Sequence, residues 1–370
     1  MSNSNSNAEE ADFALSPIEV ARREARQLDL FSLIDEPSDP ASPIKYSNFI
    51  GDIHLIPRFV RGQNPPTPIH QLPSTFSSQI SNAYSINGYS LLCTVQAATI
   101  KRKVKGVETE YFAFPGDREE IVERALFALA SNKGMTKRTL PNSEPRYGVE
   151  FSLYEIREEL RKINKTRSYD TIREALIVMR DSRCLISAKD NNGKTVHLTH
   201  NIFSGAALEQ SGSGRQRDRC FVSFSDYVVE QIRDLNYRQY RFDQVESHKA
   251  GLARFIHTYL CWNWRNAAAG ATYGLDLELV MSAYGNSKLV KRVKQRDFRA
   301  ALTILVENGD ITHVPLYKDG KYTVKATKQL ADSIHQSMQK KKGIATLSNS
   351  IMDGKVVELP PRRQIDSKLA

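Results

Sequence analysis

The sequence of 370 residues predicts an α+β fold built from two copies of one unit, in which three helices are followed by a two-stranded hairpin. An internal repeat with an offset of 126 residues is the first observation behind this prediction, because it brings Tyr147-Gly148-Val149 onto Tyr273-Gly274-Leu275. The same offset superposes two apolar stripes with the i, i+3, i+4, i+7 spacing of a helix that buries one face. The stripes are Ile172, Ala175, Leu176 and Met179, and Phe298, Ala301, Leu302 and Leu305.

The elements follow in the same order in each copy. In the first copy, apolar spacing predicts helices over 119–132, 152–163 and 168–181, and then a hairpin of 184–189 with 195–202. In the second copy, it predicts helices over 247–267, 276–284 and 288–307, and a hairpin of 311–317 with 322–327. Both hairpin tips contain Asn-Gly or Asp-Gly, which supplies the positive φ of a tight turn. Three helices and a two-stranded wing are the winged-helix form of helix-turn-helix, so the sequence predicts two tandem winged-helix domains.

Composition divides the chain into an acidic flexible leader (1–45), a first winged-helix domain (46–226), a second (227–339) and a basic tail (340–370). The leader contains nine acids and four bases, a net charge of −5, so the other 325 residues carry +15 of the total of +10. The leader is expected to be disordered apart from a helix over 16–27. Residues 204–219 are Ser/Gly-rich and basic, and are predicted to be a flexible linker. Short strands, including 89–97 and 110–114, are predicted to complete the first domain.

Several classes of protein are disfavoured. No run approaches the roughly 18 apolar residues of a spanning helix, so a membrane-spanning protein is disfavoured, and no membrane partner is predicted. The N-terminus has neither the basic nor the apolar region of a secretory signal. The cysteines are too far apart for a zinc knuckle or a redox pair, and idle thiols in a reducing cytoplasm are expected. These cysteines are Cys93, Cys184, Cys220 and Cys261. No metal or other cofactor is expected.

No catalytic motif is complete. Gly193-Lys194-Thr195 resembles the end of a phosphate-binding loop, but the earlier glycine position is occupied by Ala188. His197 and His200 lie three residues apart on a predicted strand, which places their side chains on opposite faces. The aromatic residues Tyr259, Trp262 and Trp264 could stack on single-stranded bases, although packing in the core is favoured. We therefore expect no catalytic residue, and an enzyme such as a nickase or a helicase is disfavoured.

The basic excess favours an anionic partner, nucleic acid first and an anionic membrane surface second. The outward side of the third helix distinguishes the two copies. In the second copy the outward side carries Arg292, Arg296, Arg299 and Thr303. Lysines flank it at Lys288, Lys291 and Lys294, and Lys318 and Lys321 lie on the hairpin. In the first copy it is mixed: Asp170, Arg173, Glu174, Ile177 and Asp181. Guanidinium groups pair with guanine or phosphate, whereas carboxylates oppose phosphate binding.

The second copy is therefore predicted to supply most of the affinity for DNA and most of the base readout. Between residues 286 and 329 ten bases stand against four acids, a net charge of +6. The first copy is expected to contribute through Lys165, Arg167, Arg173 and Lys194, or to be partly given over to protein contacts. The alternative is a basic face that is merely solvated.

Four stretches resemble the TrfA-type replication initiators of broad-host-range bacterial plasmids, and the likeness extends from about residue 110 to 317. They are Phe151-Ser152-Leu153-Tyr154-Glu155-Ile156, Arg219-Cys220-Phe221-Val222, the run from Gly251 to Leu260, and Ala283-Tyr284-Gly285-Asn286-Ser287. The resemblance implies binding to direct repeats (iterons) at a replication origin, and control of plasmid copy number. It also implies a monomer–dimer equilibrium and repression of the protein's own promoter.

The leader contains Gln27-Leu28-Asp29-Leu30-Phe31, which matches at every position the pentapeptide Q-L-[SD]-L-F that binds the bacterial sliding clamp. In such short-peptide recognition, Leu28, Leu30 and Phe31 fill apolar pockets and the Gln27 amide fixes the register. The alternative is that three apolar residues at the end of a helix dock on this protein itself.

The sequence as a whole predicts a cytoplasmic plasmid replication initiator. It would bind double-stranded origin DNA, promote melting of the adjacent DNA with contacts to the melted single strand, and recruit a host initiator or helicase and the sliding clamp. A transcriptional repressor or copy-number regulator without initiator activity is the alternative.

Overall fold

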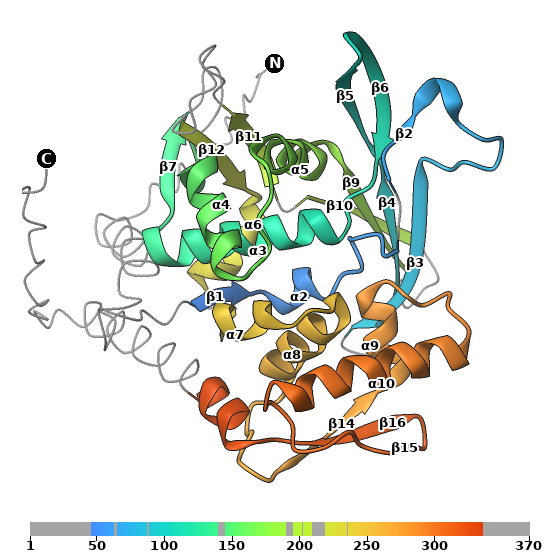
Figure 1. Ribbon diagram of the computed structural model, residues 1–370, viewed down its shortest axis with the longest axis vertical. Helices are drawn as coiled ribbons and strands as arrows, with labels where there is room; N and C mark the ends of the chain where they lie inside the picture. The colour runs from blue at the N-terminus through green and yellow to red at the C-terminus, as the bar shows by residue number, and fades with distance from the viewer. Residues whose placement is uncertain are drawn as a thin grey trace, which may run out of the picture.

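The computed structural model describes residues 46–62, 65–86, 89–139, 145–189, 195–201, 203–208, 219–234 and 236–335. The acidic leader with its helix and pentapeptide (Gln27, Leu28, Asp29, Leu30 and Phe31), the basic tail and Lys194 lie outside the described residues. Within the described residues the protein is α+β, with helices packed on antiparallel sheets (Figure 1). No described helix combines the length and the apolar character needed to cross a bilayer.

The second winged helix (residues 251–325) consists of three helices and a three-stranded antiparallel sheet. Its helices are α8 (Gly251–Asn263), α9 (Leu277–Tyr284) and α10 (Lys291–Glu307), and its strands are β14 (Thr272–Asp276), β15 (Tyr317–Lys318) and β16 (Lys321–Lys325). The sheet has the order β14-β16-β15. Asp319 and Gly320 both have positive φ at the wing tip, as predicted for the Asp-Gly turn. Helix α8 is shorter than predicted, because α7 (Phe242–Ser247) is a separate helix.

The first winged helix (residues 117–224) contains the three predicted helices. They are α3 (Asp117–Lys133), α4 (Leu153–Lys162) and α5 (Tyr169–Asp181). Helices α4 and α5 begin after Ser152 and Ser168, whose hydroxyl oxygens accept hydrogen bonds from backbone N–H groups three residues on. The predicted order of helices is therefore confirmed, and N-caps that are visible in the sequence determine where two of them begin.

The wing of the first winged helix is not the hairpin that the sequence predicted. Strand β8 (Pro145–Ser152) pairs with β12 (Arg219–Phe224), and β12 pairs with β11 (Phe203–Leu208). These strands take the positions of β14, β16 and β15, and β7 (Thr136–Thr139) adds an outer edge. The prediction of a linker over 204–219 is therefore wrong at residues 204–208 and 219, which belong to the wing strands. Residues 209–218 lie outside the described residues.

The hairpin predicted as the first wing belongs to a separate sheet. Strands β9 (Arg183–Lys189) and β10 (Thr195–His200) pair as predicted, but β9 also pairs with β4 (Tyr89–Gln96), which pairs with β3 (Gln79–Ile86). A further sheet has the strand order β2-β6-β5. Its strands are β2 (Thr67–Pro68), β5 (Ala98–Val104) and β6 (Val107–Ala113). Along the chain, β2 is followed by a short 3₁₀ helix, η1 (Ile69–Gln71). The β5–β6 hairpin projects from the body of the protein (Figure 1).

The two winged helices share one hydrophobic core. It contains Phe127 of α3, Phe224 of β12, Phe255 of α8 and Phe298 of α10, each at most 2% exposed. Strand β1 (Tyr46–Phe49) pairs with β13 (Arg238–Arg241), and α2 (Gly51–His54) follows β1. Helix α6 (Asp226–Arg233) leads from the first wing towards β13. The first described strand is thus hydrogen-bonded to a strand that precedes the second winged helix.

A buried ionic network also joins the two winged helices. The Glu120 carboxylate of α3 lies 2.5 Å from Arg61 and 3.1 Å from Arg124, and Arg124 lies 3.3 Å from Glu246 of α7. Burial alone would raise the pKa of Glu120, but the charges of Arg61 and Arg124 hold it well below its ordinary range. Because each charge has a partner, the network holds α3 against α7 without an uncompensated buried ion.

Candidate nucleic-acid interface

Helix α10 presents basic side chains on the side opposite its core stripe. Arg292, Arg296 and Arg299 follow the i, i+4, i+7 spacing of one helical face and are exposed, whereas Phe298 and Leu302 are fully buried. The Arg296 side chain is 73% exposed, and its partner among the described residues is its neighbour Asp297 at 2.9 Å. An exposed pair of this kind contributes little energy, so a phosphate or a base edge can displace the carboxylate.

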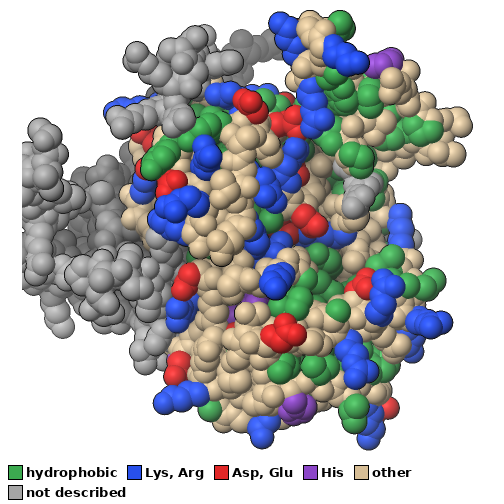
Figure 2. All heavy atoms as spheres, in the orientation of Figure 1, with side chains coloured by type: hydrophobic (Ala, Val, Ile, Leu, Met, Phe, Trp, Pro, Cys, Tyr) green, Lys and Arg blue, Asp and Glu red, His purple; other side chains and the backbone are tan. Residues whose placement is uncertain are grey.

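The basic surface continues from α10 onto the wing. Lys288 lies three residues before α10 and Lys291 is the first residue of this helix. The Lys291 ammonium lies 5.7 Å from the centre of the Tyr317 ring of β15. Lys318, Lys321 and Lys325 are exposed on β15 and β16. We name this set the α10–wing surface: Lys288, Lys291, Arg292, Arg296, Arg299, Lys318, Lys321 and Lys325. Figure 2 shows Lys and Arg side chains gathered over this part of the molecule, at the lower right.

Two residues predicted for this surface are differently placed. Lys294 points into the protein, where its side chain is 8% exposed and its ammonium lies 2.5 Å from the Glu278 carboxylate of α9. Lys294 therefore forms an ion pair that links α10 to α9, and it does not belong to the exposed surface. Thr303 is half-buried, and its hydroxyl donates a hydrogen bond to the Arg299 carbonyl oxygen within the same helix, at 3.1 Å.

Apolar residues at this surface were missed by the sequence analysis. Val290, the residue before α10, is 68% exposed, and Leu316, the residue before β15, is 86% exposed. Exposed apolar side chains beside a basic helix can contact the methyl group of thymine or the sugar edges of a groove. Both residues fit the apolar patterns of their segments, so no signal in the sequence distinguished them from core residues.

The third helix of the first winged helix is covered. Ile177 of α5 packs beside Val178 against Ala98 and Ile100 of β5. The Glu174 carboxylate lies 2.6 Å from Arg102 of β5. Glu174 and Ile177 on the outward side of α5 are therefore engaged within the chain, whereas Asp170 on the same side is 95% exposed. Figure 1 shows α5 in the upper half of the molecule and α10 in the lower half.

The residues predicted for DNA binding by the first copy do not form a surface like that of α10. Lys165 donates a hydrogen bond to the Glu246 carbonyl oxygen at 2.6 Å, and burial lowers the pKa of its ammonium to about 8. Arg173 is only 26% exposed and lies 3.6 Å from Asp170. Arg167 is exposed, and with Lys165 it lines a groove of about 900 Å³ between the two winged helices. Lys165 and Arg173 are thus engaged in contacts within the chain.

A second basic feature, the β5–β6 hairpin, was also missed. Lys101, Lys103 and Lys105 are exposed along β5 and its turn, where Lys105 and Gly106 both have positive φ. Glu108 and Glu110 of β6 lie within 4 Å of Lys101, at 3.3 and 3.9 Å, and offset part of this charge. Four of the five residues over 101–105 are basic (Lys-Arg-Lys-Val-Lys), and this run was the signal available in the sequence.

The side chains considered for other chemistry take structural roles. Tyr259 and Trp264 are buried and Trp262 packs against the core, which agrees with the packing favoured from the sequence. His197 is exposed and forms a 2.8 Å hydrogen bond with the Ser187 hydroxyl. All four cysteines are buried, and the Sγ atoms of Cys93 and Cys184 lie 3.1 Å apart.

Comparisons with known proteins find similarity only in structure. No protein family matches the sequence, and no curated protein is detectably similar to it. A crystal structure of domains 2 and 3 of RctB matches with a TM-score of 0.44 and 12% identity, over 69% of this chain and 93% of that one. The Pi initiator protein in complex with iteron DNA matches with a TM-score of 0.39 and 12% identity, over 57% and 91%. At these scores the likenesses establish neither a family nor a function for this chain.

Proposed function

We propose that this protein is a plasmid replication initiator that binds direct repeats in duplex origin DNA through its second winged helix. The observation that carries the proposal is the α10–wing surface, in which three arginines on the free side of α10 lie beside the lysines of the wing. In a winged helix of this topology, the third helix can enter the major groove while the wing contacts the flanking backbone.

The charge balance of the exposed side chains supports a polyanionic partner. Between residues 286 and 329, one base (Lys294) and one acid (Asp310) are buried. The other nine bases and three acids of this segment carry a net charge of +6 (9 − 3), the same as the whole segment. Arginines can pair bidentately with guanine, and lysines with phosphates. Arg292, Arg296 and Arg299 would therefore read bases, and Lys318 and Lys321 would fix the register on the backbone.

The first winged helix would have a different part in the complex. Its third helix is covered by β5, so contact with DNA would come from the exposed lysines of the β5–β6 hairpin. Contacts at two ends of the molecule would favour a long or bent site, and bending an A+T-rich segment would assist its melting.

Recruitment of the sliding clamp is the second half of the proposed function, and the pentapeptide Gln27-Leu28-Asp29-Leu30-Phe31 supports it. Replacing Leu30 and Phe31 together by Ala should abolish capture of the clamp and leave DNA binding intact. Leu33→Ala, two residues beyond the pentapeptide, is the matched control. Clamp capture by the double variant would contradict this half alone.

Footprinting of the purified protein on the DNA that flanks its own gene tests the DNA-binding half. We expect protection at direct repeats with a regular phase, and loss of that protection in an Arg296→Ala, Arg299→Ala double variant. Unphased protection that the double variant retains would contradict the proposal. A transformation assay with an origin plasmid, in a host that supplies the protein in trans, separates an initiator from a repressor, since a repressor would give protection and no transformants.

A further inference from the structure

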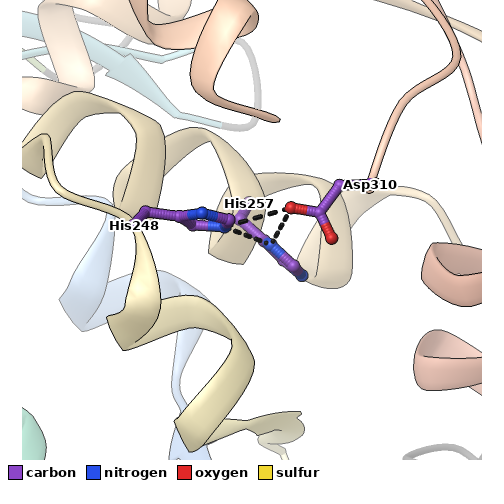
Figure 3. Close-up of side chains that lie close together, drawn as sticks. All are labelled: His248, His257 and Asp310. Carbon is purple, nitrogen blue, oxygen red and sulfur yellow. Dashed lines mark hydrogen bonds and ion pairs between the residues drawn. The ribbon is translucent and has the colours of Figure 1, made fainter. Parts of the chain in front are cut away.

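Two histidines and an aspartate converge inside the second half of the protein. His248 lies between α7 and α8, His257 lies in α8, and Asp310 follows the end of α10 (Figure 3). The His248 Nε2 and His257 Nδ1 atoms each lie 3.1 Å from the Asp310 Oδ2 atom, and the two nitrogens are 2.9 Å apart. The three side chains are at most 1% exposed.

With Asp310 ionised, protons alone cannot satisfy the three contacts. If both nitrogens carry a proton, two N–H donors face each other at 2.9 Å; if only one does, the lone pair of the other nitrogen faces the carboxylate oxygen. At least one contact therefore brings two like groups together, and in a buried site water does not relieve it. A cation among the three atoms would turn each of them into a ligand.

We infer that His248, His257 and Asp310 form a site for a divalent metal ion, and that the ion is Zn²⁺. Two imidazole nitrogens and one carboxylate oxygen form a donor set that Zn²⁺ accepts. Bonds of about 2.0–2.1 Å in tetrahedral geometry separate ligand atoms by roughly 3.3–3.4 Å, which a small outward movement of these side chains provides. The fourth position would be filled by the Asp310 Oδ1 atom or by a water molecule.

Two side-chain amides, those of Gln244 and Asn308, lie next to the proposed ligands. The Gln244 side-chain amide donates a hydrogen bond to the Asp310 Oδ1 atom at 2.7 Å. The Asn308 side-chain amide lies 3.0 Å from the His248 Nδ1 atom. With the amide oxygen turned to the ring, it would accept a hydrogen bond from Nδ1–H and leave the Nε2 lone pair directed at the centre of the cluster. Such partners orient imidazole and carboxylate ligands and increase metal affinity.

The position of the site gives the metal a structural role. Asp310 lies three residues beyond the last residue of α10, and its two partners belong to α8 and to the turn before it. Bound Zn²⁺ would therefore fasten the C-terminal end of α10 to α8. The sequence predicted no metal site, because Asp310 is 53 residues from the nearer histidine.

Metal titration of the full-length protein, after treatment with a chelator and dialysis, tests the inference. We expect one Zn²⁺ per chain, a rise in Tm on addition of Zn²⁺, and an X-ray absorption spectrum with nitrogen and oxygen neighbours and no sulfur. Less than stoichiometric Zn²⁺ on folded protein, or sulfur ligation, would overturn the assignment without the use of any variant.

Substitutions locate the ion. His257→Gln and Asp310→Asn should each weaken Zn²⁺ binding more than 100-fold, and Gln244→Ala, which leaves the three ligands in place, should weaken it about 10–100-fold. His313→Gln is the matched control, because His313 is an exposed imidazole three residues from Asp310. Unchanged Zn²⁺ binding in Gln244→Ala and in whichever ligand variant folds, or equal loss in His313→Gln, would refute the site. Circular dichroism of each metal-free variant reports whether it folds.

Discussion

The Arg124 guanidinium of α3 lies 3.3 Å from the Glu246 carboxylate of α7, and neither side chain is more than 6% exposed. Arg254 and Lys165 approach the same carboxylate, at 3.4 and 3.2 Å. One anion thus serves three cations that come from both winged helices. The contact between the winged helices is therefore electrostatic as well as apolar.

Removing the charge of Glu246 should destabilise the protein. Glu246→Gln leaves three buried cations short of an anion, which costs about 3–5 kcal/mol for a broken buried pair. Urea unfolding of wild type and variant at neutral pH measures the difference. Asp243→Asn in the same helix is the control, because Asp243 is half exposed and pairs with Arg241 on the surface. Equal stability of wild type and Glu246→Gln would mean that the network contributes nothing.

The pH dependence of stability should report on Glu120. Its pKa in the folded protein lies below the ordinary value of 4.5, so its ionised form is stabilised by folding. That contribution is complete above pH 4.5 and is lost as the pH falls below it towards the folded pKa. We expect the stability difference between wild type and Glu120→Gln to be constant from pH 6 to 7 and to shrink in acid. A difference that grows on acidification would have the wrong sign.

The charge of Arg296 should matter for DNA binding. Arg296→Ala should cost about 1–3 kcal/mol of specific binding, or roughly 5–150-fold in Kd, with a smaller salt slope if a phosphate contact is lost. Arg161→Ala is a matched control, since Arg161 is also exposed on a helix and paired with a nearby acid. Lys294→Met is a second control, which removes a base of α10 that faces Glu278. If all three substitutions weakened DNA binding equally, the binding would depend on the overall positive charge of the protein and not on Arg296.

The two glycines of the sequence repeat should differ in their tolerance of substitution. A Cβ atom on Gly148 would lie 2.0 Å from the Val222 carbonyl oxygen of the paired strand, whereas on Gly274 the nearest atom would be 3.8 Å away. Gly148→Ala should therefore lower the free energy of unfolding by about 3 kcal/mol, and Gly274→Ala should change it by less than about 1 kcal/mol. Thermal unfolding of both variants provides the measurement. Equal effects would mean that β8 and β12 are less closely paired than described.

The helices could be predicted because their signals are local. The apolar stripe around Leu176 and Leu302, and the caps at Ser152 and Ser168, lie within the helices they define. The wing of the first winged helix could not be predicted, because both β9–β10 and β11–β12 are hairpins and only a distant pairing with β8 distinguishes them. The 126-residue offset is also not kept between the strands and the helices that follow them. Gly148 lies five residues before Leu153, the first residue of α4, whereas Gly274 lies three residues before Leu277, the first residue of α9.

The candidate site shows the same division. The exposed arginines of α10 follow from helical spacing, so three of them were identified correctly as outward-facing. The burial of Lys294 and the half-burial of Lys165 could not be predicted, because charged residues are expected at the surface unless a partner is known. Their partners, Glu278 and Glu246, are 16 and 81 residues away.

The pairing of β1 with β13 has a mechanical consequence. Tyr46 is the first residue of β1, and its Cα partner is Arg241. Tension applied to the chain ahead of Tyr46 is therefore carried into the β1–β13 ladder, beside α3 and α7, rather than into α10. A partner that holds the N-terminal residues would apply force to the contact between the two winged helices and would not apply it to the basic helix α10.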